Sequence, residues 1–256
     1  MMPGAPNVFF MLNQQYMQAC GAGQQAMMLE ASGNGPAAAQ QYEQAIAVLA
    51  NSMMMARQWG VFVPDSILFA FAYSHFSAAR VEAALGWPQA PAHLSLALEA
   101  LNQAIAVNPN VFQYHVVAGA VLTAQGDLPW AVQAFTRALQ LNPADVWSRY
   151  MLSALYSMQG NVVMAGQHFA AVQQVAPSLP SPQQFLPPPS APGSAAGPAQ
   201  GQTNWLDTTV KVVGVLKTIT EVANNMSGWF GGSSHASAWT MGGMGGMGGM
   251  GGGRLF

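Results

Sequence analysis

Small and apolar residues recur at helical spacing along the first 177 residues, and two segments carry the same pattern without a gap. The first segment reads Gly126, Ala131, Phe135, Ala138 and Pro143. The second reads Gly160, Ala165, Phe169, Val172 and Pro177, each 34 positions later (126 to 160, 143 to 177). The surrounding Ala-, Leu- and Gln-rich stretches contain no convincing run of alternating apolar and polar residues, so they predict helices rather than strands.

The pattern extends toward the N-terminus with less regularity. The same step backwards from Pro143 leads to Pro109, which Ala97, Leu101 and Ala104 precede. A further match lies upstream, out of register, and comprises Gly33, Ala38, Tyr42 and Ala45. Between these matches we expect helices at about 66–85 and 93–108. Residues 53–65 are either an insertion or the extension of a long helix that ends at Gly60.

Particular residues mark where these helices begin and end. Asp127 precedes Leu128 and Pro129, which is typical of a capping residue followed by proline in the first turn. Asp145 and Asp65 are expected to cap in the same way. Gly60 and Gly86 are expected to end helices, because glycine adopts the left-handed backbone conformation of a helix C-terminus without strain.

This pattern resembles the tetratricopeptide repeat, most closely over residues 112–177. The resemblance implies an all-α fold in which each repeat is a helical hairpin. Ala131 and Ala138 let two helices approach closely, and Phe135 fills the space between them. One hairpin cannot bury its own apolar face, so hairpins stack into a solenoid. We assign residues 1–176 to this repeat domain, with an irregular N-terminal half.

The resemblance also implies a concave groove lined by the first helix of each hairpin. Its groove positions map onto Gln113, Val116, Ala120 and Thr123 in one repeat, and onto Trp147, Tyr150, Ala154 and Met158 in the next. These positions carry no positive charge, so the groove is not expected to hold a carboxylate. An apolar or amphipathic segment is the predicted ligand. The alternative is that Trp147 and Tyr150 pack between repeats as part of the core.

Three further segments follow the repeats. Residues 177–204 are rich in Pro, Ser, Ala and Gly and predict an extended linker. Residues 205–230 predict an amphipathic helix whose apolar side comprises Trp205, Val212, Leu216, Ile219 and Met226. Residues 231–256 form a Gly- and Met-rich tail, similar to the tails of chaperonins and some co-chaperones, that is expected to be disordered. The helix is expected to dock on protein, in its own groove or in a neighbour's, rather than on a membrane, since its two lysines are offset by Asp207 and Glu221.

Composition narrows the range of partners. Of the 256 residues, 51% are hydrophobic and 6% are charged, and the formal net charge is -2. The seven basic residues are scattered, so the sequence does not predict a nucleic-acid site. A surface with so little charge resists self-association weakly, which favours a homo-oligomer or a polymer. No signal peptide or membrane span is predicted, and a cytoplasmic location is expected.

Catalytic and metal-binding motifs are missing from the sequence. The five histidines have no metal-ligand spacing, and none is expected to pair with a carboxylate or with Cys20. Cys20 lies in an Ala/Gly-rich stretch and is expected to be buried and inert. There is neither a phosphate-binding loop nor a nucleophile turn. We therefore expect no enzyme activity, no cofactor and no metal.

Three functions remain open. The first is a protein–protein interaction scaffold or adaptor that binds an apolar or amphipathic segment in its groove. The second is a structural protein that assembles with itself, with the 205–226 helix docking on a neighbouring subunit. The third is a chaperone-like holder of apolar chains, suggested by the Met-rich tail.

Overall fold

The computed structural model of this protein describes residues 7–184, and over that range it contains eight α-helices and no strand. The helices are α1 (Val8–Ala31), α2 (Gly35–Gln58), α3 (Asp65–Ala84), α4 (Ala90–Val107), α5 (Phe112–Gln125), α6 (Leu128–Leu141), α7 (Val146–Met158) and α8 (Val162–Val175). A short 3-10 helix, η1 (Pro182–Gln184), follows. The prediction of an all-α fold is confirmed.

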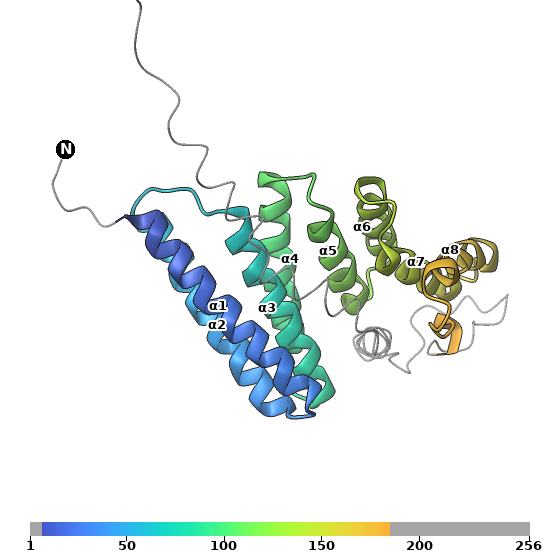
Figure 1. Ribbon diagram of the computed structural model, residues 1–256, viewed down its shortest axis with the longest axis horizontal. Coiled ribbons are helices and arrows are strands. Elements are labelled where there is room, and N and C mark those ends of the chain that lie inside the picture. Colours follow the sequence, from blue (N-terminus) through green and yellow to red (C-terminus); the bar gives the residue numbers. More distant parts are fainter. Residues whose placement is uncertain (1–6, 185–256) are drawn as a thin grey trace, which may run out of the picture.

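Consecutive helices form four hairpins within the described residues, namely α1–α2, α3–α4, α5–α6 and α7–α8. Each hairpin packs mainly on its neighbours, through α2 on α3, α4 on α5 and α6 on α7. The hairpins follow one another along the long axis of the molecule, from the blue end to the orange end (Figure 1). This arrangement is the predicted solenoid of helical hairpins.

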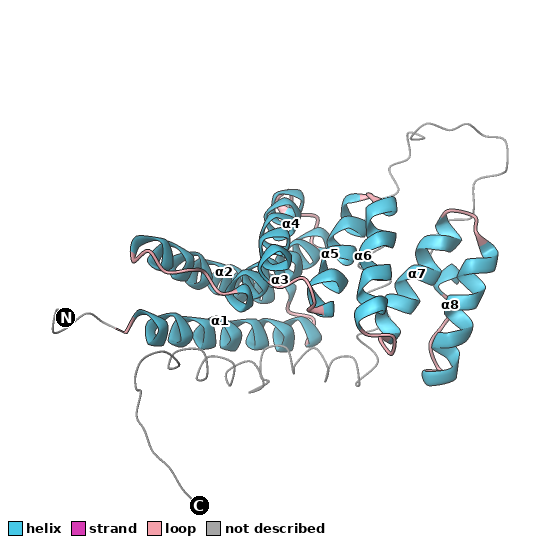
Figure 2. Cartoon of the chain, turned by 90° about the horizontal axis from the view of Figure 1, so that it is seen from above, coloured by secondary structure: helices cyan, strands magenta, loops and turns pink. Residues whose placement is uncertain are grey.

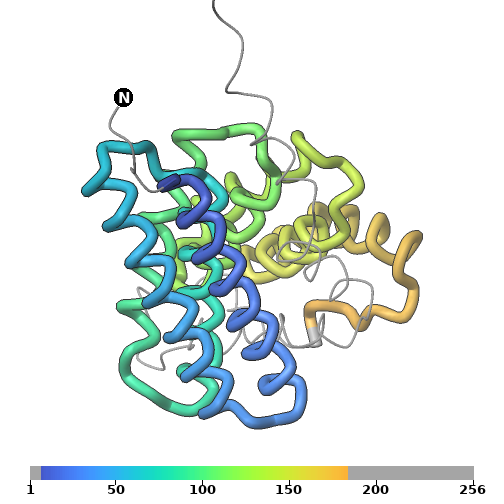
Figure 3. Tube along the Cα trace, turned by 60° about the vertical axis from the view of Figure 1, so that its left-hand side comes forward, coloured from blue at the N-terminus to red at the C-terminus, as the bar shows by residue number. Residues whose placement is uncertain are grey.

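The hairpins differ in length and direction. Helices α1 and α2 have 24 residues each, whereas α7 has 13 and α8 has 14. Seen from above, α1 and α2 run nearly along the stack while α7 and α8 run across it (Figure 2). The tube in Figure 3 shows the long first hairpin standing against the shorter ones behind it. The predicted irregularity of the first half therefore has the form of longer helices.

Glycines end several of these helices as predicted. Gly126 adopts φ 83° after α5, and Gly86 adopts φ 73° after α3. Both values lie in the left-handed region that favours glycine. Gly60, at φ 64°, follows α2, which continues through Gln58. Residues 53–58 are therefore the extension of a long helix, and the connection to α3 is short.

The three aspartates predicted as N-caps behave differently. Asp145 caps α7, because its Oδ2 accepts a hydrogen bond from the Ser148 amide at 2.8 Å. Asp127 holds the N-cap position of α6 but makes no capping hydrogen bond. The prediction for Asp65 is wrong, because Pro64 is the N-cap residue of α3. The Asp65 Oδ2 instead accepts hydrogen bonds from the Tyr114 hydroxyl at 3.0 Å and from Asn108 Nδ2 at 3.3 Å, so tertiary contacts use it.

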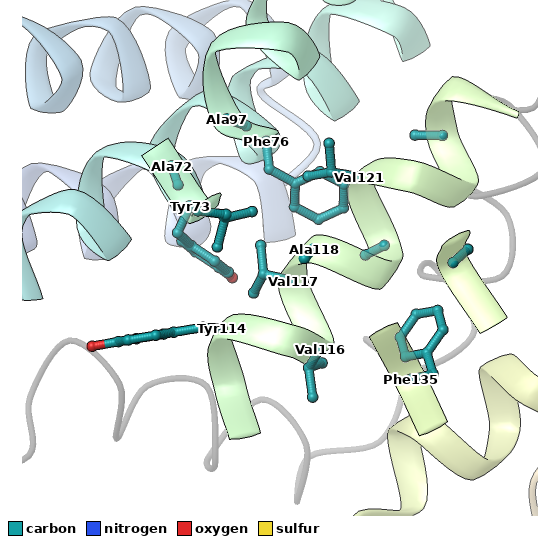
Figure 4. Close-up of a cluster of buried hydrophobic side chains, with 14 of the residues drawn as sticks. Ala72, Tyr73, Phe76, Ala97, Tyr114, Val116, Val117, Ala118, Val121 and Phe135 are labelled. Carbon is teal, nitrogen blue, oxygen red and sulfur yellow. The ribbon is translucent and has the colours of Figure 1, made fainter. Parts of the chain in front are cut away.

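The repeated small and aromatic residues form the core. Ala131, Phe135 and Ala138 are fully buried, and so are Ala38, Tyr42 and Ala45 in the first hairpin. Between hairpins, Tyr73 and Phe76 of α3 lie against Val117 and Val121 of α5 (Figure 4). Each hairpin is therefore covered by the next, as the stacking argument requires.

Candidate functional site

The predicted groove residues of α5 lie mostly inside the molecule. Val116 and Thr123 are buried, and the Thr123 hydroxyl donates to the Gly119 carbonyl oxygen at 2.7 Å. Gln113 is half-buried. Of these three side chains, Gln113 therefore offers the most surface to a partner.

The predicted groove residues of α7 likewise include both half-buried and fully buried side chains. Trp147 and Met158 are half-buried and pack against the main core cluster. Tyr150 is fully buried and meets Phe169 edge-on, with ring centroids 6.5 Å apart. Its hydroxyl donates to the Pro180 carbonyl oxygen at 3.2 Å, and burial raises its pKa to about 12.

The chain itself covers Tyr150. Leu179 is 5% exposed, Pro182 is buried, and η1 contacts α7. Residues 177–184, the start of the predicted linker, therefore pack as an apolar segment on the first helix of the last hairpin. The rest of that linker, the predicted docking helix with Trp205, Val212, Leu216, Ile219 and Met226, and the predicted Gly/Met-rich tail lie outside the described residues.

A polar cluster around His93 was not predicted from the sequence. His93 of α4 places its Nε2 3.2 Å from Glu43 Oε1 of α2 and 3.5 Å from Glu82 Oε1 of α3. Its Nδ1 lies 2.7 Å from Nδ1 of His75 in α3. The prediction that no histidine pairs with a carboxylate is therefore wrong. These residues come from three helices, so no spacing along the chain signals their meeting.

Burial shapes the electrostatics of this site. Burial raises the pKa of Glu82, with His93 opposing and Glu43 adding to the shift. Burial and the neighbouring His93 lower the pKa of His75 to about 4, which keeps its ring neutral at pH 7. Glu43, Glu82 and His93 each offer one ligand atom, and these atoms lie within 4.8 Å of one another. They form the one group of three or more His, Cys, Asp or Glu side chains with metal-ligand geometry in the described part of the chain.

A buried ion pair lies nearby and ties α1 to α3. Arg80 donates to both carboxylate oxygens of Glu30, with Nη2 2.7 Å from Oε2, and the Arg80 side chain is 9% exposed. The Tyr42 hydroxyl adds a hydrogen bond to the same carboxylate at 3.4 Å. This pair connects the first two hairpins. Its two charges are largely buried and are paired with each other.

Comparison with known proteins identifies one of the repeats. Residues 134–172, which span the end of α6, all of α7 and most of α8, match the tetratricopeptide repeat family. Residues 134–172 thus carry a tetratricopeptide repeat. No curated protein sequence matches it.

Several solved structures of tetratricopeptide repeat proteins are similar to this one. TTC0263 of Thermus thermophilus is 18% identical, with 78% of this chain and 99% of that chain covered and a TM-score of 0.37. MamA of Desulfovibrio magneticus RS-1 is 14% identical, with 62% and 96% covered and a TM-score of 0.35. YrrB, described as having an unusual peptide-binding site, is 14% identical, with 68% and 95% covered and a TM-score of 0.35.

The surface of the helical repeat domain exposes several large apolar side chains. They include Phe9, Phe10 and Met17 on α1, Trp59 and Phe62 after α2, and Trp130 at the start of α6. Of the helices that the structure describes, none is both long enough and apolar enough to span a bilayer. A stack of repeats presents an extended surface to other proteins, so this fold supports a protein–protein interaction scaffold.

Proposed function

We propose that this protein binds an apolar or amphipathic segment of a partner protein along the first helices of its repeats. The contact between Tyr150 and residues 179–180 carries the proposal. There, a predicted groove residue donates a hydrogen bond to a main-chain carbonyl, and the neighbouring Leu179 is buried in the same hydrophobic cluster. A partner segment would use the same combination of apolar burial and main-chain hydrogen bonding.

The chemistry of the neighbouring surface supports the same ligand class. Gln113 and Trp147 are half-buried, so each side chain is held by its neighbours on one side and is accessible to a partner on the other. Tryptophan commonly contributes a large share of binding free energy at protein interfaces. The chain has seven basic and nine acidic residues, too few to make charge the main source of affinity. The proposed role requires no catalysis and no cofactor.

Two tryptophans allow a matched test. Peptides selected on the immobilised full-length protein would be labelled, and their affinity measured by fluorescence anisotropy. Trp147→Ser on α7 is expected to weaken binding by about tenfold or more, or about 1.4 kcal/mol. Trp130→Ser on α6 removes the same side chain from a site that is 59% exposed, and it is expected to leave binding unchanged. Equal losses in both variants, or none in Trp147→Ser, would contradict the proposal.

Self-assembly is a second candidate, favoured by the outer face of α1. Phe10, Met17 and Met28 are exposed and lie seven and eleven residues apart, or about two and three helical turns, so they share one side of the helix. The helix is the terminal one of the stack. A second copy of the chain is the proposed partner for this stripe, through the helix predicted from the sequence at 205–226.

Light scattering across a dilution series tests this second candidate. The average molar mass of the full-length protein is expected to fall on dilution. The double variant Phe10→Gln, Met17→Gln is expected to have an average molar mass closer to that of the monomer. Val163→Gln replaces an exposed apolar residue on α8 and serves as the control. A monomer mass that is independent of concentration would exclude assembly. The cytoplasmic location and the chaperone-like role remain predictions.

A further inference from the structure

Three helices from two hairpins bring one ligand atom each to a single point. Glu43 comes from α2, Glu82 from α3 and His93 from α4. His75 of α3 is buried and lies beside the His93 ring, with ring centroids 5.0 Å apart. The cluster thus has a ligand set and a supporting residue, and the proposed binding function uses neither.

The separations fit a bound cation better than direct ion pairs. Charge-assisted N–H···O hydrogen bonds usually measure about 2.7–2.9 Å. Here His93 Nε2 lies 3.2 Å from Glu43 Oε1 and 3.5 Å from Glu82 Oε1. Zinc binds nitrogen and oxygen at about 2.0–2.2 Å, so two ligands of a tetrahedral zinc lie about 3.3–3.5 Å apart. Both distances are close to that edge length.

Glu82 provides an independent reason for a cation. Its side chain is 5% exposed, yet its Oε2 accepts no hydrogen bond. Apart from His93 at 3.5 Å, no positive group pairs with this carboxylate among the described ion pairs. A buried carboxylate without donors is costly, because it has lost its hydration and gained nothing in return. A metal ion would supply the missing partner.

The two histidines orient the ligand nitrogen. Two Nδ1 atoms 2.7 Å apart need one hydrogen between them. When His93 donates it, its Nε2 carries a lone pair directed at two carboxylates, an arrangement that is repulsive without a positive ion. Histidines that bind metals usually donate their other ring N–H to a second residue in this manner.

We propose that Glu43, Glu82 and His93 bind one divalent metal ion, with Zn²⁺ preferred, and that the ion holds α2, α3 and α4 together. Imidazole favours zinc over magnesium or calcium. The two carboxylates and a neutral imidazole carry two negative charges, which one such ion neutralises. Glu43, with its side chain 49% exposed, leaves the site open to solvent for a fourth ligand such as water.

The test uses full-length protein that has been stripped with EDTA. Titration with zinc chloride by calorimetry is expected to give one site per chain, and Co²⁺ is expected to give visible absorption bands typical of nitrogen and oxygen ligands. His93→Gln and Glu82→Gln are each expected to weaken zinc binding at least 100-fold. His115→Gln and Glu99→Gln, which change a histidine and an exposed glutamate elsewhere, are expected to bind as the unchanged protein does.

Thermal unfolding gives a second readout. Zinc is expected to raise the unfolding temperature of the unchanged protein, and EDTA is expected to reverse the effect. If a buried-site variant fails to fold, Glu43→Gln replaces an exposed ligand and keeps the test open. No saturable binding at one ion per chain, or equal binding by the ligand variants and the controls, would overturn the proposal.

Discussion

A single glycine sets the distance between α5 and α6. An ideal Cβ built on Gly119 would lie 2.8 Å from two carbons of the Phe135 ring. Phe135 is fully buried, so its ring has no free space to enter. Ser153 takes the equivalent place 34 residues later, and its hydroxyl donates to the Ala165 carbonyl oxygen of α8 at 2.9 Å. Small residues at this position allow the two helices of a hairpin to approach.

Gly119→Ala is therefore expected to destabilise the fold by about 1–3 kcal/mol, the usual cost of overpacking a core. Gly166→Ala on α8 is the matched control, because a Cβ there meets nothing within 4 Å. That change is expected to be neutral or to stabilise by about 0.5–1 kcal/mol through helix propensity. Urea unfolding of both variants measures the difference, and equal free energies would contradict the close approach.

Cys20 is buried, as predicted, and burial raises the pKa of its thiol to about 11, with a hydrogen bond involving Tyr16 opposing the shift. Because the thiolate is the reactive form, alkylation by iodoacetamide at pH 8 is expected to be roughly 100-fold slower than for a free cysteine. The rate is expected to keep rising with pH up to about 11. In denaturing urea the reaction should return to the rate of a free thiol. Rapid labelling of the folded protein would show that the thiol is accessible.

At the scale of elements, the ion pair between Arg80 and Glu30 helps to join the first hairpin to the second. Arg80→Met leaves the Glu30 carboxylate largely buried without its guanidinium partner and is expected to cost about 3–5 kcal/mol. Combining it with Glu30→Leu removes the unpaired charge and is expected to recover much of that loss. Arg137→Met, on the exposed side of α6, is the control and is expected to change stability by less than about 0.5 kcal/mol. Chemical unfolding of these variants beside the unchanged protein provides the comparison.

The elements themselves were largely predictable because their signals are local. Gly126 and Gly86 end helices through a backbone conformation that each residue adopts by itself. Asp145 caps α7 through a residue three positions away. Asp65 was wrongly predicted to be an N-cap. Its carboxylate accepts a hydrogen bond from Tyr114, which lies 49 positions further along the chain and could not be foreseen from the local sequence. The meeting of Glu43, Glu82 and His93 had no sequence signal for the same reason, since it depends on how three helices pack.

At the scale of the molecule, the segment that follows α8 covers part of the last hairpin of the stack. Pro177 stands 34 residues after Pro143, and the segment that follows packs on α7 where a further hairpin would begin. In a linear array each unit depends on its neighbours, so the end hairpin is the most sensitive to losing a cover. Leu179 and Pro180 provide that cover.

Leu179→Ser is expected to cost about 1–3 kcal/mol and to act unevenly along the array. Hydrogen exchange is expected to accelerate more in α7 and α8 than in α1 and α2. Ser178→Ala, at the exposed neighbouring position, is expected to leave exchange unchanged. Uniform acceleration across all helices would show that the protein unfolds as one unit.

The 34-residue step also has a consequence for how the chain can vary in length. Because the second helix of each described hairpin packs on the first helix of the next, a duplicate of residues 143–176 inserted after residue 176 is expected to pack on α7 and α8 in the same way. The Pro180 carbonyl oxygen would then accept its hydrogen bond from the duplicated tyrosine instead of from Tyr150. A chain with this geometry can gain or lose whole units during evolution and still finish with the same closing segment.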